Sequence, residues 1–588
     1  MTQNEFNLLY AIKKNGISSI RKISRLANVS VGYASQKINS FIENEFIVDG
    51  EITNKGLMQL APYKVKNAVI MAAGAGSHFA PMSFEKPKGL LSVKNEVLIE
   101  RQITQLQDAG IKEIIIIVGY KKEAFFYLET KYEGIKFIIN PEYINKNNSY
   151  TLFLTQKFLE NTYICSSDDY FEENPFEEYV YESFYSGVKT EDKLNEWYMS
   201  INSKGYISHI EKAGTKGYVM LGHAYWDREF SRCMKNIFND QALFSQYEQS
   251  IWEQILADKL KELPAVKMKE YPRSIIFEFD SLDDLRKFDY NYVEHTNLKI
   301  MHNISKVLSC RESEISDFEP IKEGLTNTSF VFSVSGMQYV YRHPGEGTEA
   351  IISRTHEKKA LELAYAAEID PTFVYMDAEE GWKISKFVKG IRTPKYDSFE
   401  DSKRVISVLK KLHKSNMSVD WSFMPWEEAQ KIETILKSEK EGIVDPEYSS
   451  IKKNVNKCFE KCQGDGILPC FCHCDTYAPN WMFTSEQTIL IDWEYAGNAD
   501  PGCDLGTYIM DSMWDIPQAD AFIKEYCKEE MNEKLRFHFL AYVAIVSFYW
   551  YVWALYREAC GAIMGESLYN WRHMAQKYSQ YLTDAYDL

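Results

Sequence analysis

Between residues 66 and 165 the chain alternates short apolar runs with segments of helical length, and this alternation limits the fold more than any other feature. The segments are Ala68–Ala73, the helical Leu98–Ala109, Ile114–Val118, Phe137–Ile139 and Tyr163–Cys165. Short β-type runs separated by helices are typical of a largely parallel sheet that is covered on both faces. The sequence therefore predicts an α/β, Rossmann-like domain in this region.

The chain is too long for one hydrophobic core, because 588 residues exceed the usual size of a domain several times. We expect three domains, at residues 1–64, 66–290 and 295–588. The last of them begins with short strands up to about Val388 and continues with mostly helical patterns, which predicts a two-lobed α+β fold.

Charge and cysteine content exclude several classes of protein. The net charge of −17 opposes non-specific binding of the whole chain to nucleic acid or to anionic membranes. The 11 cysteines lack a closely spaced paired framework, and the N-terminus lacks the pattern of a signal peptide, so we expect a cytoplasmic protein. The uncharged Phe539–Tyr556 carries Tyr and Trp through its middle, which favours a buried helix over a membrane span.

The first 64 residues differ from the rest by being basic, with nine Lys and Arg up to Lys66 against five acids. A helix near Phe6–Lys14 is followed by two shorter helical patterns around the turn at 28–30, and then by the hairpin pair Asp49-Gly50. The apolar faces that we expect for the second and third helices consist of Ile20, Ile23, Leu26, Val31, Ala34, Ile38 and Phe41.

This order of elements resembles a winged helix-turn-helix domain with an α+β fold. The resemblance implies DNA binding through the recognition helix, which carries Ser30, Gly32, Tyr33, Ser35, Gln36 and Lys37. An interaction or dimerisation module that kept the fold explains the same residues equally well. Both readings stay open.

A glycine-containing loop follows the first strand of the second region. Ala73, Gly74 and Gly76 allow backbone N–H groups to approach phosphates, and Lys88 follows in the segment Lys86-Pro87-Lys88. Together these motifs resemble the sugar-nucleotide type of nucleotidyltransferase, and within it the bacterial CTP:phosphocholine cytidylyltransferases. The resemblance extends over about residues 66–290.

The resemblance implies that Asp168 and Asp280 hold Mg²⁺ between the nucleotide phosphates, and that Lys88 stabilises charge at the reacting phosphorus. Two positions depart from the family, which has arginine in place of His78 and an acid in place of Ser166. The aromatic residues Trp197, Tyr225, Trp226 and Trp252 belong either to the core or to a site for a trimethylammonium group.

The third region contains Asp475, then Asn480 five residues later, then Asp492 twelve residues beyond. This spacing resembles the protein-kinase-like arrangement of a catalytic base, Asp475, and two ligands for Mg²⁺. The resemblance also implies a nucleotide-binding site upstream. It consists of a loop between two strands and of a basic residue that pairs with an acid on a helix. These residues are Gly324, Thr326, Asn327, Arg342 and Glu357.

This region resembles the choline/ethanolamine kinases, which are aminoglycoside phosphotransferase-like. The resemblance rests on the arginine at position 342 and on the lack of a protein-kinase Asp-Phe-Gly motif. Trp550 and Trp553 are three residues apart on one helical face and resemble the tryptophan pair that boxes choline there, with Glu494 nearby as a further binding residue. A buried aromatic stripe is the plainer explanation, and the two are compatible.

Cys470, Cys472, His473 and Cys474 have the residue types of a zinc site. Side chains that alternate along a strand point to opposite faces, and no matching cysteine pair lies near in the sequence. We therefore expect buried thiols beside a structural histidine.

The two enzyme-like regions make sense together if they share a metabolite. We expect ATP and choline to give phosphocholine in the third region, and CTP and phosphocholine to give CDP-choline in the second, both with Mg²⁺. Ethanolamine, another amino alcohol or a sugar phosphate fits the same folds. A transcription regulator that senses choline or nucleotide through degenerate catalytic domains is the remaining alternative, and in it residues 1–64 bind DNA.

Overall fold

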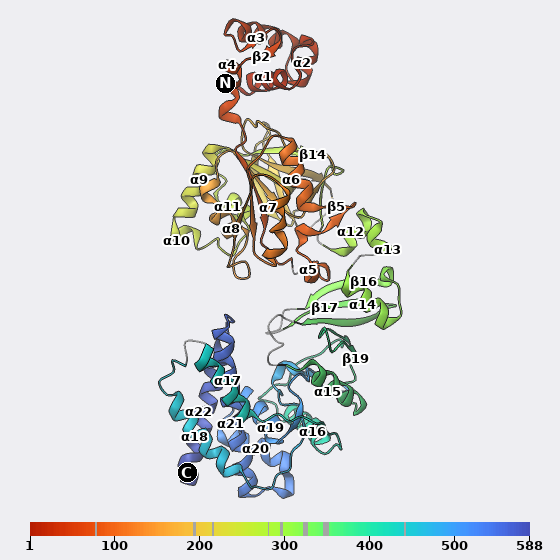
Figure 1. The fold of residues 1–588 in the computed structure, drawn as a ribbon, viewed down its shortest axis with the longest axis vertical. Coiled ribbons are helices and arrows are strands. Elements are labelled where there is room, and N and C mark those ends of the chain that lie inside the picture. The colour runs from red at the N-terminus through yellow and green to blue at the C-terminus, as the bar shows by residue number, and fades with distance from the viewer. Residues whose placement is uncertain are drawn as a thin grey trace. The chain divides into compact units, whose positions relative to one another are not determined.

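The computed structural model describes residues 1–76, 79–191, 196–214, 217–279, 281–294, 298–321, 327–344, 352–439 and 443–588. The chain forms two compact units, Met1–Pro320 and Ile321–Leu588. In Figure 1 the first unit runs from red to green and the second from green to blue. The structure thus gives two units, and the division of the chain into three domains remains a prediction.

The first 60 residues, all described, form four helices and a two-stranded hairpin (Figure 1). The elements are α1 (Gln3–Asn15), α2 (Ile20–Leu26), α3 (Val31–Glu43), β1 (Ile47–Val48), β2 (Glu51–Ile52) and α4 (Asn54–Leu60). The hydroxyls of Ser19, Ser30 and Thr53 accept hydrogen bonds from the first turns of α2, α3 and α4. These N-caps explain why each helix begins where it does.

The apolar faces of α2 and α3 are narrower than the sequence pattern predicted. Ile23 is fully buried, but Ile20, Leu26 and Val31 are 36%, 52% and 47% exposed. All three are the first or last residues of their helices, and the core here depends on residues further inside the helices. These are Ile23, Ala34, Ile38 and Phe41.

An aromatic contact joins these helices to the rest of the first unit. Phe6 packs against Tyr181 and Tyr10 against Tyr179, with ring centroids 5.4 and 5.5 Å apart. Nζ of Lys13 lies 2.6 Å from a carboxylate oxygen of Glu178. Because Tyr179 belongs to the same buried cluster as Phe6 and Tyr10, the first 60 residues are packed onto this segment.

The rest of the first unit is built around one sheet, for which nine strands are found among the described residues. The order is β12-β11-β13-β8-β3-β6-β7, and β10 and β14 join it through β13. The strands are β3 (Asn67–Ala72), β6 (Ile114–Val118), β7 (Ile135–Ile139), β8 (Thr162–Ser166), β10 (Phe184–Thr190), β11 (Trp197–Ile201), β12 (Ile207–Lys212), β13 (Gly217–Trp226) and β14 (Lys267–Tyr271).

The sheet is mixed, which corrects the expectation of a largely parallel one. Strands β7, β6, β3 and β8 run parallel, but β13 runs antiparallel to β8, to β10 and to β11, and β12 antiparallel to β11. The connections from β10 to β13 are a few residues long. A parallel neighbour requires a longer crossover, so these strands pair antiparallel.

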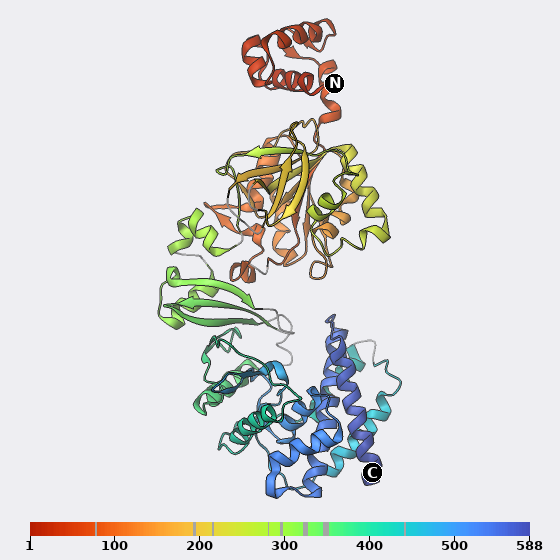
Figure 2. The same cartoon turned by 180° about the vertical axis from the view of Figure 1, so that it is seen from behind.

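Helices cover both faces of the sheet, as Figure 2 shows from behind. Alternate residues of β3 enter different cores, because Ile70 belongs to the same buried cluster as Ile103 and Val69 to the same cluster as Leu152. The remaining helices and short strands are α5 (Met82–Glu85), β4 (Ser92–Val93), β5 (Glu96–Val97), α6 (Leu98–Asp108), α7 (Tyr127–Lys131), α8 (Asn148–Leu154), β9 (Asp169–Phe171), α9 (Arg228–Asn239), α10 (Gln241–Phe244), α11 (Trp252–Lys259), β15 (Ile276–Glu278), α12 (Leu282–Phe288), α13 (Asn291–Glu294) and α14 (Lys299–Leu308).

The C-terminal part combines a sheet with a helical region. Among the described residues the sheet has five strands in the order β16-β17-β18-β20-β19, antiparallel from β17 onward. These strands and the helix among them are β16 (Ile315–Ile321), β17 (Asn327–Val334), β18 (Met337–Pro344), α15 (Arg354–Ala366), β19 (Phe373–Met376) and β20 (Lys383–Lys386).

The helical region, which runs from teal to blue in Figure 1, contains short strands between its helices. Its elements are α16 (Phe399–His413), α17 (Pro425–Glu439), α18 (Tyr448–Cys462), β21 (Cys470–Cys472), β22 (Trp481–Phe483), β23 (Thr488–Leu490), β24 (Gly497–Ala499), α19 (Gly502–Asp511), α20 (Ile516–Cys527), α21 (Glu533–Ala559) and α22 (Glu566–Tyr586). By length and composition α21 is long and apolar enough to cross a membrane, yet 83% of its most apolar window is buried in the protein. It forms the centre of the core.

Candidate functional site

A cavity of about 650 Å³, which we term the first cavity, lies where β3 and β8 end. Its wall contains Ala73, Gly74 and Gly76 together with Lys88 and Asp168. Gly76 has a φ of +60°, a conformation that glycine adopts at little cost. The structure therefore brings the predicted phosphate-binding loop, the lysine and one predicted metal ligand to one place.

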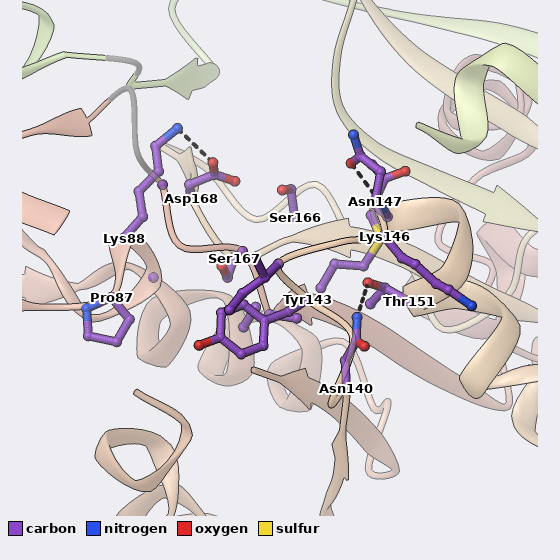
Figure 3. Close-up of a pocket in the computed structure, with 18 of the residues that line it drawn as sticks. Pro87, Lys88, Asn140, Tyr143, Lys146, Asn147, Thr151, Ser166, Ser167 and Asp168 are labelled. Carbon is purple, nitrogen blue, oxygen red and sulfur yellow. Dashed lines mark hydrogen bonds and ion pairs between the residues drawn. The ribbon is translucent and has the colours of Figure 1, made fainter. Parts of the chain in front are cut away.

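Lys88 and Asp168 form an ion pair in the wall of this cavity (Figure 3). Nζ of Lys88 lies 2.7 Å from Oδ2 of Asp168, and each side chain is 15% exposed. Burial favours the neutral acid, but the charge and the hydrogen bond of Lys88 outweigh it, so the pKa of Asp168 is lowered. Oδ1 of Asp168 is buried and has no hydrogen-bond partner among the described residues. An ionised carboxylate with an unsatisfied oxygen fits a Mg²⁺ ligand.

Gly89 is a residue that sequence reasoning missed. A Cβ at this position would lie 2.8 Å from the Cβ of Ser167, closer than real side-chain contacts. A glycine here lets the loop that carries Lys88 approach Ser167 and Asp168. On the opposite wall, Nδ2 of Asn140 donates to the hydroxyl of Thr151 at 3.1 Å (Figure 3).

A second cavity, of about 200 Å³, adjoins the first, because Met71, Asn148 and Ser166 line both. Aromatic and acidic side chains make up much of its wall. They are Tyr185, Trp197, Trp252, Asp169, Glu196, Glu253 and Glu278. Asp168 and Asp169 are neighbours in sequence, yet the first lines the larger cavity and the second lines the smaller one.

The acids of the second cavity are held in an environment that disfavours charge. Burial raises the pKa of Glu253 to about 7, although Tyr185 donates a hydrogen bond of 2.9 Å to it. Burial, together with the charges of Glu278 and Asp168, raises the pKa of Asp169. A cationic group that entered this cavity would meet carboxylates and aromatic faces together, the pattern that binds quaternary ammonium ions.

The predicted aromatic set divides between this cavity and the core. Trp197 and Trp252 line the second cavity. Tyr225 and Trp226 are 0% and 1% exposed and line neither described cavity, so their position agrees with the first of the two alternatives, packing in the core. As neighbours on β13 they point into opposite cores. Trp226 still packs edge-on against Trp252, with centroids 5.1 Å apart.

In the second unit, Asp475 and Asn480 lie in the loop between β21 and β22. Nδ2 of Asn480 donates to Oδ2 of Asp475 at 3.0 Å, which leaves the amide oxygen as the atom that could bind a cation. Oδ2 and Oδ1 of Asp504 accept hydrogen bonds from the backbone N–H of His473 and Cys474, at 3.1 and 2.6 Å, and so fix the loop. Burial and the charges of Asp492 and Glu494 raise the pKa of Asp475, which makes its carboxylate a stronger base.

A buried ion network surrounds Asp492. Arg342 on β18 contacts Glu357 on α15 at 2.6 Å and Oδ1 of Asp492 at 3.0 Å. Lys383 on β20 reaches the same two acids at 3.3 and 3.1 Å, and sequence reasoning missed it. Although burial opposes ionisation, these cations lower the pKa of both Glu357 and Asp492. Glu494 is different, because burial and Asp492 raise its pKa to about 7.

The predicted tryptophan pair joins a larger aromatic cluster. Trp550 and Trp553 on α21 are 5% and 4% exposed, with centroids 5.5 Å apart. Tyr495, the residue after Glu494, packs edge-on against Trp550 at 5.2 Å. Trp571 on α22 lies 5.7 Å from Trp550, and nothing in its local sequence signals this role.

Some predicted residues fall outside the described residues, namely His78, Asp280, Gly324 and Thr326, and Asn327 is described only as the first residue of β17. In α3, Gln36 is exposed and Tyr33 is partly exposed. Ser30 is occupied as the N-cap, and Nζ of Lys37 lies 2.6 Å from a carboxylate oxygen of Glu5.

Two family models match the chain. The one described as nucleotidyl transferase matches residues 67–183, and the one described as phosphotransferase enzyme family matches residues 317–538. A choline-phosphate cytidylyltransferase of Streptococcus pneumoniae is 34% identical over 222 residues, which are 38% of this chain and 96% of the relative. The chain belongs to the choline-phosphate cytidylyltransferase family.

Other relatives resemble one part of the chain each. A 2-aminoethylphosphonate cytidylyltransferase of Lancefieldella rimae is 33% identical over 39% of this chain and 93% of its own length. A solved choline kinase of Streptococcus pneumoniae is 24% identical and covers 48% of this chain and 98% of that one, with a TM-score of 0.42. This member of the choline-phosphate cytidylyltransferase family thus joins a nucleotidyltransferase to a phosphotransferase.

Proposed function

We propose that the chain makes CDP-choline in two steps. The C-terminal part transfers the terminal phosphate of ATP to choline, and the part around the first cavity transfers CMP from CTP to the resulting phosphocholine and releases pyrophosphate. The observation that carries this proposal occurs in both parts. Each places aromatic and acidic side chains near residues suited to phosphate chemistry. They are Trp252 and Glu253 in one part, and in the other Tyr495, which packs against Trp550 and directly follows Glu494.

For cytidylyl transfer we propose that the first cavity holds CTP and the second holds the choline end of phosphocholine. The shared wall at Ser166 brings the two ligands together. Lys88 stabilises the charge that develops on the α-phosphate, and Asp168, with Asp280, holds Mg²⁺. The bound Mg²⁺ would neutralise phosphate charge.

For phosphoryl transfer we propose that Asp475 accepts the proton of the choline hydroxyl, while Asn480 and Asp492 hold Mg²⁺. Arg342 and Lys383 are placed to bind the nucleotide phosphates beside Asp492. Trp550 and Trp553 present aromatic faces to the trimethylammonium group.

The test incubates the full chain with choline, ATP, CTP and Mg²⁺ and follows the products by ³¹P NMR. We expect CDP-choline from the wild type, no product from Asp475→Asn, and phosphocholine alone from Asp168→Asn. Glu172→Gln, an exposed acid near Asp168 in sequence, serves as the matched control. Parallel reactions with ethanolamine and 2-aminoethylphosphonate identify the acceptor. If choline gives neither product while either alternative does, the assignment of choline fails.

We also propose that residues 1–64 form a winged helix-turn-helix domain of a cytoplasmic enzyme and bind DNA. The exposed Arg21, Lys22, Arg25 and Gln36 support this proposal, whereas the ion pair of Lys37 with Glu5 weakens the contribution of Lys37. An Arg21→Gln/Arg25→Gln variant of the full chain should lose a salt-dependent mobility shift that the wild type shows. No shift of the wild type at low salt would leave the interaction-module reading instead.

A further inference from the structure

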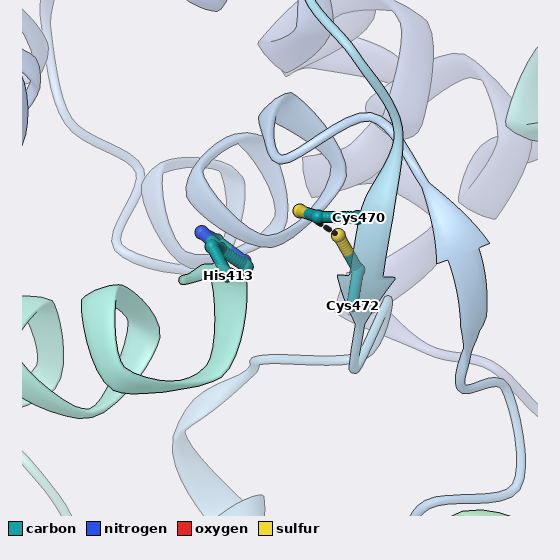
Figure 4. Close-up of side chains that lie close together, drawn as sticks. All are labelled: His413, Cys470 and Cys472. Carbon is teal, nitrogen blue, oxygen red and sulfur yellow. Dashed lines mark hydrogen bonds between the residues drawn. The ribbon is translucent and has the colours of Figure 1, made fainter. Parts of the chain in front are cut away.

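A histidine and two cysteines converge behind the loop that carries Asp475. His413 is the last residue of α16, and Cys470 and Cys472 are the two ends of β21. Residues two apart on a strand point to the same face, and Figure 4 shows both sulfur atoms on the side of β21 that faces His413. The sulfur atoms are 3.6 Å apart. One ligand atom of each side chain lies within 4.8 Å of the others.

The contacts of His413 place a carboxylate at one ring nitrogen and a hydroxyl at the other. Nε2 lies 2.8 Å from Oδ2 of Asp504. The same oxygen accepts a hydrogen bond from the backbone N–H of His473 at 3.1 Å, so it is an acceptor to which Nε2 donates. Nδ1 then accepts from the hydroxyl of Tyr526, at 2.8 Å. A histidine whose other N–H is held by a carboxylate is the arrangement typical of metal ligands.

Distance and charge both favour a zinc ion. Two thiolates bound at about 2.3 Å to a tetrahedral zinc ion lie about 3.8 Å apart, close to the separation observed here. Two thiolates and one neutral imidazole balance the charge of a dication, which suits side chains as buried as Cys472, at 0%, and His413, at 4%. We propose that His413, Cys470 and Cys472 bind zinc, with solvent or the Tyr526 hydroxyl as the fourth ligand.

A second cluster with similar residue types has a different chemistry. His538 lies 3.1 Å from a carboxylate oxygen of Asp465 and 3.0 Å from one of Asp500, with Cys462 nearby. Burial opposes its charge, but these carboxylates outweigh burial and raise the pKa of His538. A protonated imidazole between two carboxylates offers no lone pair, so it is an ion pair rather than a metal ligand.

The proposed ion would fix the position of the loop that carries Asp475. Strand β21 leads directly into His473, Cys474 and Asp475, and Asp504 contacts both this loop and His413. A thiol binds zinc as the thiolate, so zinc binding releases protons and weakens as the pH falls. The expected readouts are therefore metal content, its pH dependence, and the rate of phosphoryl transfer alone.

The test measures zinc in the full chain, purified under reducing conditions without a histidine tag. We expect about one zinc per chain, and we expect Cys470→Ser and Cys472→Ser each to bind zinc at least about tenfold more weakly. Cys560→Ser, an exposed thiol outside the cluster, is the matched control and should retain the metal. Circular dichroism and thermal unfolding of every variant report whether the second unit, which carries the cysteines, is folded.

Cobalt substitution of the wild type tests the site without any variant, and so still gives a result if the cysteine variants fail to fold. Co²⁺ bound by two thiolates in a tetrahedral site gives intense ligand-field and sulfur charge-transfer absorption. A zinc-selective chelator that spares Mg²⁺ should slow phosphoryl transfer and leave cytidylyl transfer unchanged. A wild type that binds neither zinc nor cobalt, or a Cys472→Ser variant that retains both, would overturn the site without touching the proposed two-step synthesis.

Discussion

The two catalytic regions hold their carboxylates in different ways. Asp168 has one cationic partner, Lys88, and one buried oxygen without a described hydrogen-bond partner. Asp492 shares two cations, Arg342 and Lys383, with the fully buried Glu357. In the first arrangement one lysine neutralises the carboxylate. In the second, two cations share two carboxylates, and each cation also stabilises the fold.

The largest expected effect separates the two regions completely. Asp475→Asn removes the base but keeps the shape and the hydrogen bond to Asn480, so the kcat of choline phosphorylation should fall about 10²–10⁴-fold. Cytidylyl transfer to added phosphocholine should be unchanged. Steady-state kinetics of each half-reaction checks this, and an equal loss in both would mean that the two regions are not separate catalysts.

The single-cation region is tested by Lys88→Met, with Lys88→Arg as the variant that keeps the charge. Loss of the cation should lower the kcat of cytidylyl transfer about 10²–10³-fold, and Lys88→Arg should recover part of it. Should Lys88→Met retain near wild-type kcat, another group supplies the charge at the first cavity.

The network is tested by Lys383→Met, because Arg342 still contacts Glu357 and Asp492 in this variant. We expect a loss of about tenfold in kcat/KM for ATP, about 1.4 kcal/mol. Adding Arg342→Met should cost more than the sum of the single effects, since it leaves two buried carboxylates without either cation. Additive losses would show that the two cations act independently.

The smallest expected effect concerns the pH dependence of the second cavity. The raised pKa of Glu253 means that the folded protein favours the neutral acid, so this group's contribution to stability falls as the pH rises from about 4.5 towards 7. The affinity of the second cavity for a cation should increase over the same pH range, because the carboxylate of Glu253 becomes charged. The KM for phosphocholine should therefore fall several-fold as the pH rises through about 7.

Glu253→Gln is the control for that titration, because the substrate phosphate also ionises near this pH. The variant should show a flatter KM profile, with the remaining slope due to the substrate. Identical profiles for the variant and the wild type would exclude Glu253 from cation binding. Trp252→Phe should raise the KM at all pH values and leave the slope unchanged.

Residues that lie in one loop could be predicted to meet. The spacing of Asp475 and Asn480 resembles a kinase arrangement, and the loop that carries both brings their side chains into a hydrogen bond. The strands of the parallel half of the sheet, near Ile114–Val118 for example, also follow from their apolar runs. Lys88 and Asp168 depended on a resemblance to a family, which the structure then placed around one cavity.

Residues that act through tertiary contacts could not be predicted in this way. Lys383 and Trp571 reach their sites from elements whose packing no local pattern encodes. His413 is another example, because a search for zinc ligands near Cys470 in the sequence cannot find a residue on α16. The sequence also could not decide between the core and a binding site for Tyr225, because aromatic residues on a strand form the same pattern in both.

The neighbouring acids Asp168 and Asp169 have a consequence for how such an enzyme can evolve. Asp168 lines the cavity proposed for the nucleotide and Asp169 the cavity proposed for the acceptor, and a single peptide bond joins the two residues. A backbone shift that suited a new acceptor at Asp169 would also displace the carboxylate of Asp168, the proposed Mg²⁺ ligand. We therefore expect that a change of acceptor arises from substitutions on other elements, for example at Trp197 and Trp252. Such substitutions leave Asp168 and the reaction unchanged.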